Sequence, residues 1–207
     1  MVRVMLVEDQ RTARLVLEDA IARGKSFEIV VSIEDASLAE LYCESNEIDL
    51  ILMDVYTAQR ANGLDAAGKI KERFPRIKII IVTAMPEHSF IQKAKAIGCE
   101  SFWYKDVGNL DLLSVMERTI EGESIYPETS PVLDIGIAKS IDFTPRELEV
   151  LREKINGYSN QEICNRLGIK KSTLDYHIKN ILSKSGYSNV LRLSMDVVEQ
   201  KFIIPDF

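Results

Sequence analysis

The stretch Leu50-Ile51-Leu52-Met53-Asp54 decides the fold, because an uninterrupted apolar run ends there in a carboxylate. The run is too short for a helix and is apolar at successive positions, which is typical of a strand buried on both faces of a parallel sheet. In open α/β sheets, ligands bind outside the carboxyl ends of the strands. Asp54 therefore lies where chemistry is expected.

The N-terminal part of the chain alternates between short apolar runs and amphipathic helical patterns. The expected strands are residues 4–7, 27–31, 50–53, 79–82 and 102–104. The expected helices are residues 11–23, 36–44, 64–73, 88–97 and 109–121. This alternation predicts an α/β fold with a doubly wound, five-stranded parallel sheet and helices on both faces.

Polar side chains follow four of the five expected strands. Glu8 and Asp9 follow the first, Asp54 the third, Thr83 ends the fourth and Lys105 follows the fifth. In the flavodoxin-like strand order 2-1-3-4-5, these ends meet at one crevice, and the second strand lies outside it. We expect the five side chains to form one site.

Three carboxylates in one crevice repel one another. Two unit charges about 4 Å apart cost about 4 kcal/mol at an effective dielectric of about 20. Lys105 can offset one charge, and Mg²⁺, which prefers oxygen ligands, can offset two. A carboxylate beside Mg²⁺, an ammonium and a hydroxyl is suited to phosphoryl transfer, with Asp54 as the nucleophile.

This set of residues at strand ends, in this chain order, resembles the receiver domain of bacterial two-component response regulators over residues 1–122. The resemblance implies that Asp54 accepts phosphate from a histidine kinase. It also implies that Glu8, Asp9, Asp54 and the backbone carbonyl of Tyr56 hold Mg²⁺. A receiver assists only its own phosphoryl transfer and dephosphorylation, so no other enzymatic activity is expected.

By the same resemblance, Lys105 pairs with the phosphoryl group and Thr83 turns its hydroxyl toward it. Phe102 falls at the aromatic position whose ring changes orientation with Thr83. A phosphatase or mutase of the haloacid dehalogenase type would need a second Asp two positions after the nucleophile, where this chain has Tyr56.

The loop after Asp54 departs from the receiver pattern. Receivers of this kind usually have Met-Pro shortly after the phosphoacceptor and Gly eight positions beyond it. Here Gly63 stands nine positions after Asp54, and residues 55–62 contain no proline. Proline would restrict the backbone of this loop, so its absence bears on Mg²⁺ affinity and on the lifetime of the phosphorylated state.

Residues 123–142 read as a linker, because Pro127, Pro131 and Gly136 interrupt any regular pattern. We expect a short helix over 131–140 within it.

The net charge of −6 is distributed unevenly along the chain. Residues from Phe143 onward hold 10 Lys and Arg against 8 Asp and Glu, a net charge of +2, which leaves −8 for residues 1–142. The two parts are therefore expected to have different partners.

Residues 143–207 predict a small all-α domain. The sequence Thr-Pro-Arg-Glu at 144–147 combines an N-cap, a proline at the first helical position and a capping-box glutamate. Ser-Asn-Gln-Glu at 159–162 repeats the capping box, and Gly168 separates that helix from a third over 172–185. A fourth helix is expected over 190–201. Two short helices joined at a glycine turn are typical of a helix-turn-helix.

The motifs Phe-Thr-Pro-Arg-Glu at 143–147 and Gly-Tyr-Ser-Asn-Gln-Glu-Ile at 157–163, with Thr173-Leu174, His177, Ile181 and Lys184, resemble the output domain of LuxR and NarL (FixJ) regulators. The resemblance implies binding to double-stranded DNA, as a homodimer when active. The positions that match DNA contacts in this family lie on the third helix and are Asp175, Tyr176 and Lys179. Lys171, Ser172 and Lys184 on the same helix complete the expected set of DNA-binding residues.

Asp175 departs from the family, which usually has Lys at this position. One interpretation, which we favour, is a Ser172–Asp175 capping pair that compensates for the missing N-cap residue at Lys170. The alternative is that Asp175 accepts a hydrogen bond from a cytosine amino group in the major groove.

The sequence thus predicts a phosphorylation-controlled transcription regulator of a two-component system. The alternative is a receiver whose output domain acts independently of phosphorylation or through protein contacts. No apolar stretch is long enough to cross a bilayer and no signal-peptide pattern opens the chain, so we expect a cytoplasmic protein without a membrane partner. Three cysteines, far apart in apolar surroundings, favour neither disulfides nor a zinc site.

Overall fold

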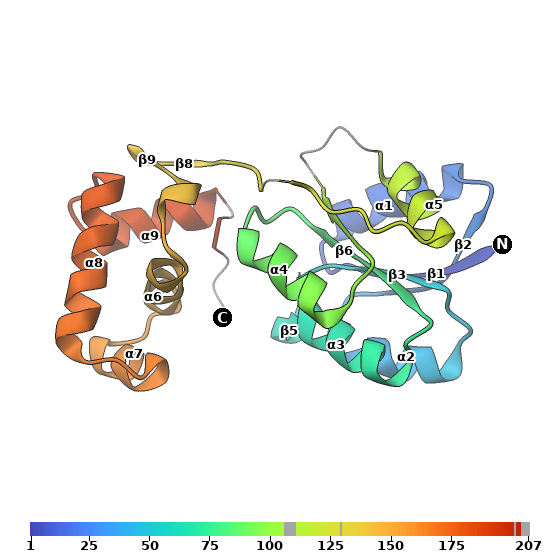
Figure 1. Cartoon of the computed structure of the whole chain (residues 1–207), viewed down its shortest axis with the longest axis horizontal. Coiled ribbons are helices and arrows are strands. Elements are labelled where there is room, and N and C mark those ends of the chain that lie inside the picture. Colours follow the sequence, from blue (N-terminus) through green and yellow to red (C-terminus); the bar gives the residue numbers. More distant parts are fainter. Residues whose placement is uncertain (106–110, 129, 201, 204–207) are drawn as a thin grey trace. The chain divides into compact units, whose positions relative to one another are not determined.

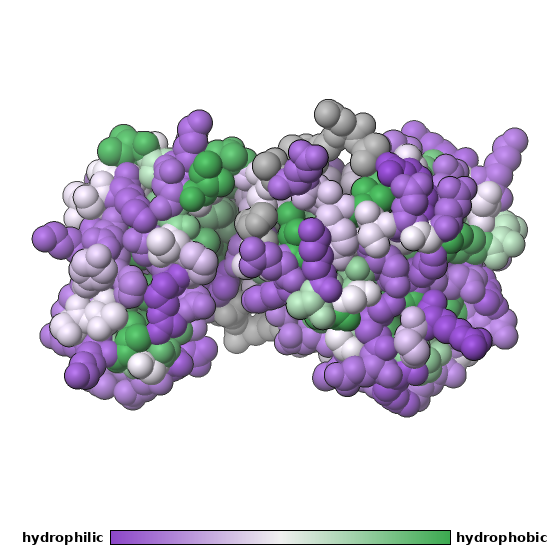
Figure 2. Space-filling view, in the orientation of Figure 1, coloured by the Kyte–Doolittle hydropathy of each residue, from purple (hydrophilic) through white to green (hydrophobic). Residues whose placement is uncertain are grey.

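The computed structural model describes residues 1–105, 111–128, 130–200 and 202–203. The chain forms two compact units, one of Met1–Ala84 with His88–Thr129 and the other of Met85–Glu87 with Ser130–Phe207. The visible surface of each unit is mainly hydrophilic, with small apolar patches (Figure 2). Among the described helices, none has both the length and the apolar character that a membrane span needs.

A five-stranded parallel sheet forms the centre of the first unit (Figure 1). Its strands are β1 (Val2–Val7), β2 (Phe27–Ile33), β3 (Leu50–Met53), β6 (Lys78–Thr83) and β7 (Ser101–Tyr104). The order β2-β1-β3-β6-β7 confirms the predicted flavodoxin-like order, because β4 and β5 belong to a separate hairpin. All four residues of β3 are fully buried, as the apolar run predicts.

Helices cover both faces of this sheet (Figure 1). They are α1 (Arg11–Arg23), α2 (Ala39–Ser45), α3 (Gly63–Arg73), α4 (His88–Ile97) and α5 (Leu112–Glu121). The side chains of Leu6, Leu52 and Ile80 point to the face covered by α1 and α5 and form a core with Leu17 and Val115. The helix predicted over 109–121 begins at Leu112, because Asp111 is its extended N-cap residue, and residues 109 and 110 lie outside the described part.

The loop after Asp54 forms a small antiparallel hairpin that the sequence does not predict. It consists of β4 (Tyr56–Thr57) and β5 (Ala61–Asn62), joined by a 3₁₀ turn over Ala58–Arg60. Gln59 in this turn has a φ of 59°, a left-handed conformation that is uncommon outside glycine. The extra residue of the loop is thus taken up in a tight turn.

The second unit is helical, as predicted. Its helices are α6 (Pro145–Ile155), α7 (Asn160–Leu167), α8 (Lys171–Ser185) and α9 (Val190–Glu199). Both predicted capping boxes form, at the start of α6 and of α7. Gly168, with a φ of 63°, turns the chain between α7 and α8. Ile163, Leu174 and Leu193 lie in the core that joins the helices.

The prediction of a short helix over residues 131–140 is wrong. The structure has a hairpin there, β8 (Asp134–Ile135) and β9 (Ala138–Lys139). Gly136 turns the hairpin with a φ of 62°, and a Cβ built at this position would lie 2.1 Å from the carbonyl oxygen of Ser185. Ile137 N donates to that same oxygen at 3.0 Å. The hairpin therefore depends on a contact with the end of α8, which the local sequence does not reveal.

Candidate functional site

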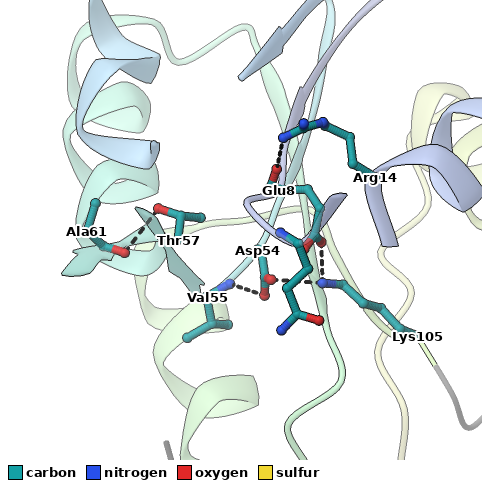
Figure 3. A network of polar contacts seen from close by, with 8 residues as sticks. Glu8, Arg14, Asp54, Val55, Thr57, Ala61 and Lys105 are labelled. Carbon is teal, nitrogen blue, oxygen red and sulfur yellow. Dashed lines mark hydrogen bonds and ion pairs between the residues drawn. The ribbon is translucent and has the colours of Figure 1, made fainter. Parts of the chain in front are cut away.

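The ends of β1, β3, β6 and β7 bring the predicted strand-end residues to one edge of the sheet. Lys105 reaches across this edge, and its Nζ donates to Asp54 Oδ2 at 2.8 Å and forms an ion pair with Glu8 (Figure 3). Asp54 Oδ1 accepts from the amide of Val55 at 2.7 Å. The geometry therefore brings Glu8, Asp54 and Lys105 together, as the strand order predicts.

Burial dominates the electrostatics of this cluster. Glu8 is fully buried and Asp54 is 7% exposed. Burial, reinforced by the charge of Glu8, raises the pKa of Asp54 to about 6, although Lys105 and the Val55 amide oppose the rise. Burial also opposes the charge on Lys105, but Asp54 and Glu8 raise the pKa of its ammonium overall. Asp54 is thus a poorly solvated carboxylate held beside a fixed cation.

The acidic residues fit a hard divalent cation. One carboxylate oxygen from each of Glu8, Asp9 and Asp54 lies within 4.8 Å of the others. Mg²⁺ is bound by a few such oxygens and keeps several waters. A second positive charge beside these carboxylates would also reduce their mutual repulsion. The residues present therefore fit Mg²⁺.

Thr83 and Phe102 occupy neighbouring strands beside this cluster. Thr83 ends β6, is buried, and accepts at its carbonyl oxygen from the Lys105 amide at 2.9 Å. Phe102 is fully buried, and its ring meets that of Tyr104 edge to face at 5.0 Å. Tyr104 pairs in register with Thr83. Strand register and ring packing thus connect Thr83 to Phe102 through Tyr104.

The hairpin after Asp54 is fixed at both of its ends. Thr57 Oγ1 accepts from the Ala36 amide at 2.9 Å and donates to the Ala61 carbonyl at 3.2 Å, the latter shown in Figure 3. Gly63 N donates to the Val55 carbonyl at 2.8 Å. The ring of Tyr56 packs edge to face on Phe90 of α4, at 5.9 Å. The longer loop thus keeps a defined path past the cluster.

The sequence analysis did not predict two features of this hairpin: the hydrogen bonds of Thr57 and the close approach of Gly63 to Asp54. A Cβ built on Gly63 would lie 1.8 Å from the carbonyl oxygen of Asp54. The glycine itself is visible in the sequence, but its contact with Asp54 becomes evident only once the hairpin is known. Nothing in the sequence distinguishes Thr57 from an ordinary strand residue.

Most of the predicted DNA contacts lie on the exposed side of α8. Lys171, Ser172, Asp175, Tyr176 and Lys179 are all exposed. They fall within the first nine residues of the second helix of the helix-turn-helix. This end of such a helix is the part that contacts base edges in the major groove.

Lys184 differs from the other five. Its Nζ donates to Glu147 Oε2 at 2.7 Å and to the Asp142 carbonyl at 2.8 Å. These bonds tie α8 to the start of α6. A DNA phosphate would have to compete with both oxygens for this ammonium.

The predicted capping pair of Ser172 and Asp175 is wrong. The N-cap of α8 is Lys170, no side chain caps the helix, and no acidic residue lies in its first turn. Ser172 is already the second residue of the helix, so its hydroxyl lies two positions after the N-cap, too late to cap. Asp175 is left exposed, one turn from Lys171 and one turn from Lys179.

Two families match the chain. Residues 4–117 match the response regulator receiver domain, and residues 142–193 match the LuxR family of bacterial regulatory proteins. The response regulator protein VraR of Staphylococcus epidermidis is 30% identical over 190 residues, which cover 88% of this chain and 90% of the relative. VraR of Staphylococcus aureus has the same identity and coverage.

Solved structures show the same fold. RcsB from Salmonella enterica serovar Typhimurium, bound to promoter DNA in the presence of the phosphomimetic BeF₃⁻, aligns with a TM-score of 0.62 at 19% identity, over 95% of this chain and 97% of that chain. The response regulator ChrA of a heme-sensing two-component system aligns with a TM-score of 0.52 at 21% identity, over 98% of both chains.

Proposed function

Because the chain belongs to the response regulators in which a receiver domain precedes a LuxR-type DNA-binding domain, we propose that phosphorylation of Asp54 controls DNA binding by α8. We assign residues 1–122 to the receiver and 143–207 to the DNA-binding domain. The phosphodonor is a histidine kinase, and the active form is a homodimer whose two α8 helices meet two DNA half-sites.

The observation that carries this proposal is the contact of Lys105 with both Asp54 and Glu8 at the edge of the sheet. Asp54 Oδ2, next to the ammonium, is the nucleophile for a phosphoryl group. Lys105 Nζ then pairs with the phosphoryl oxygens, and the hydroxyl of Thr83 donates to one of them. Phe102 is the switch residue, and its ring changes orientation when Thr83 moves.

Glu8, Asp9, Asp54 and the carbonyl of Tyr56 would hold Mg²⁺ in this proposal. The bound ion would neutralise charge on the transferring phosphoryl group. The phosphoryl group adds about −1.5 to −2 charges and three acceptor oxygens. It thereby draws Lys105 and Thr83 inward and biases the face of the receiver near α4 and α5.

The test is labelling by acetyl phosphate in the presence of Mg²⁺, read as a mass increase of the intact protein. Asp54→Asn keeps the shape of the side chain but removes the nucleophilic oxygen pair, so labelling should be lost. Asp19→Asn is the matched control, because Asp19 is an exposed carboxylate of α1 whose ion pair with Arg23 lies on the surface. Undiminished labelling of Asp54→Asn would contradict the assignment.

A further inference from the structure

Asp175 is an exposed carboxylate on the helix that we propose to enter DNA. It is the fifth residue of α8, and Lys171 and Lys179 lie one turn before and after it. Residues four apart on a helix are neighbours on one side of it. Asp175 is the one acidic residue of α8, beside three lysines. The carboxylate therefore lies within a positively charged stretch.

The fold gives this carboxylate no other role. It does not cap α8, and within the described part of the chain no hydrogen bond or ion pair engages it. Its side chain is exposed rather than packed on the core of the second unit. A carboxylate at this place is repelled by phosphates, so a favourable contact between Asp175 and DNA can only be with a base edge.

The chemistry of the major groove limits what that contact can be. A carboxylate only accepts hydrogen bonds. The groove offers two kinds of donor, the N4 amino group of cytosine and the N6 amino group of adenine. The adenine donor lies beside the N7 acceptor, which repels the second carboxylate oxygen, whereas cytosine has no acceptor next to its amino group in the groove. A cytosine is therefore the better partner.

On these grounds, and resting on the proposed DNA binding, we propose that Asp175 is a specificity-determining residue that selects a C·G base pair in each half-site. Lys171 and Lys179, on either side of it, bind phosphates or guanine edges and offset its charge. The segment 171–179 of α8 thus combines two lysines that hold the helix on the DNA with one carboxylate that recognises a base.

The experiment selects binding sites for the full chain, treated with Mg²⁺ and BeF₃⁻, from a pool of randomised DNA duplexes. Each position of the selected duplex is then changed to the other base pairs, and affinities are measured at one fixed salt concentration. For the unaltered chain, one position in each half-site should prefer C·G by about tenfold or more.

Two variants separate base selection from simple charge. Asp175→Ala should lose the preference at that position and keep it elsewhere. Asp175→Asn should move the preference to A·T, because an amide pairs with both N6 and N7 of adenine. Glu199→Gln is the matched control, since it removes one exposed carboxylate from α9 of the same unit and should leave every preference unchanged.

The inference is overturned if Asp175→Ala retains every base preference, or if it and Glu199→Gln strengthen binding to all duplexes equally. In either case the proposed DNA binding stands. If the unaltered chain selects no sequence at all, the proposed function fails and the inference fails with it.

Discussion

Glu147 joins the start of α6 to α8 through a single carboxylate. Its Oε2 accepts from the Thr144 amide at 2.7 Å and from Lys184 Nζ at 2.7 Å, and the residue is only 3% exposed. Burial opposes the charge, but the bonds from Lys184 and Thr144 outweigh it and hold the pKa of Glu147 below its usual value. The ionised form is thus bound more tightly in the folded state than in the unfolded state.

Replacing Glu147 should therefore change stability in a pH-dependent way. The contribution of a carboxyl with a lowered pKa is fully present above its unfolded-state pKa, about 4.3 for Glu, and is lost as pH falls through the folded-state pKa. Glu147→Gln should cost about 1–3 kcal/mol at pH 7, because Lys184 loses its carboxylate partner, and less at pH 3. Thermal unfolding followed by circular dichroism at both pH values measures this difference.

Trp103 provides an internal control for that experiment. It is the one tryptophan of the sequence and lies in the first unit, so its fluorescence follows the receiver. The variant should leave the fluorescence transition in place. An equal loss of stability at pH 7 and pH 3 would point to packing rather than to the charge of Glu147.

At the scale of elements, α3 contains two glycines in opposite situations. A Cβ on Gly63 would meet the Asp54 carbonyl oxygen at 1.8 Å, whereas a Cβ on Gly68 would have no atom within 4 Å. Gly63→Ala should therefore push α3 away from Asp54, destabilise the receiver by about 2–4 kcal/mol and reduce phosphoryl labelling. Gly68→Ala should stabilise it by about 0.5–1 kcal/mol, because alanine favours the helix.

Urea unfolding followed by Trp103 fluorescence measures both variants. Opposite signs are expected from the same chemical change in the same helix. If both alanines stabilise the receiver, the close approach of Gly63 to Asp54 does not limit the fold.

A separate prediction concerns the contribution of the exposed face of α8 to DNA affinity. Lys179 is exposed, so its ammonium is available to a phosphate. Lys179→Ala should weaken binding to all sequences and lower the slope of log affinity against log salt by about one. Arg192→Ala removes an exposed charge from α9 instead and should keep the slope. An unchanged slope for Lys179→Ala would remove this residue from the phosphate contacts.

The elements differ in how far the sequence predicts them. The run 50–53 is apolar throughout, and helices such as α6 begin with a capping box, so each carries its own signature. The strands β4, β5, β8 and β9 have two residues each, too few for a periodic pattern. They depend on contacts with distant residues, such as Thr57 with Ala36 and Gly136 with Ser185.

The same distinction applies to the candidate site. Glu8, Asp54 and Lys105 are predictable because parallel strands end at one edge of the sheet. The bond between Lys184 and Glu147 spans 37 positions of sequence and could not be read from either residue. The role of Asp175 depended on where α8 begins: the capping interpretation needs Ser172 at the N-cap, but the N-cap is Lys170, two residues earlier.

At the scale of the whole molecule, the question is whether the receiver controls the DNA-binding domain. The alternative to control by phosphorylation is an output domain that acts independently of it. With Mg²⁺ and BeF₃⁻, the full chain should shift from monomer to dimer in sedimentation and bind its selected DNA more tightly. The reason is that the phosphoryl mimic should pull Lys105 and Thr83 inward, as proposed for the phosphoryl group. Asp54→Asn should respond to neither addition, since it lacks the carboxylate that holds the mimic. If DNA affinity and mass are the same with and without BeF₃⁻, while acetyl phosphate still labels Asp54, then Asp54 is a phosphoacceptor that does not control the output.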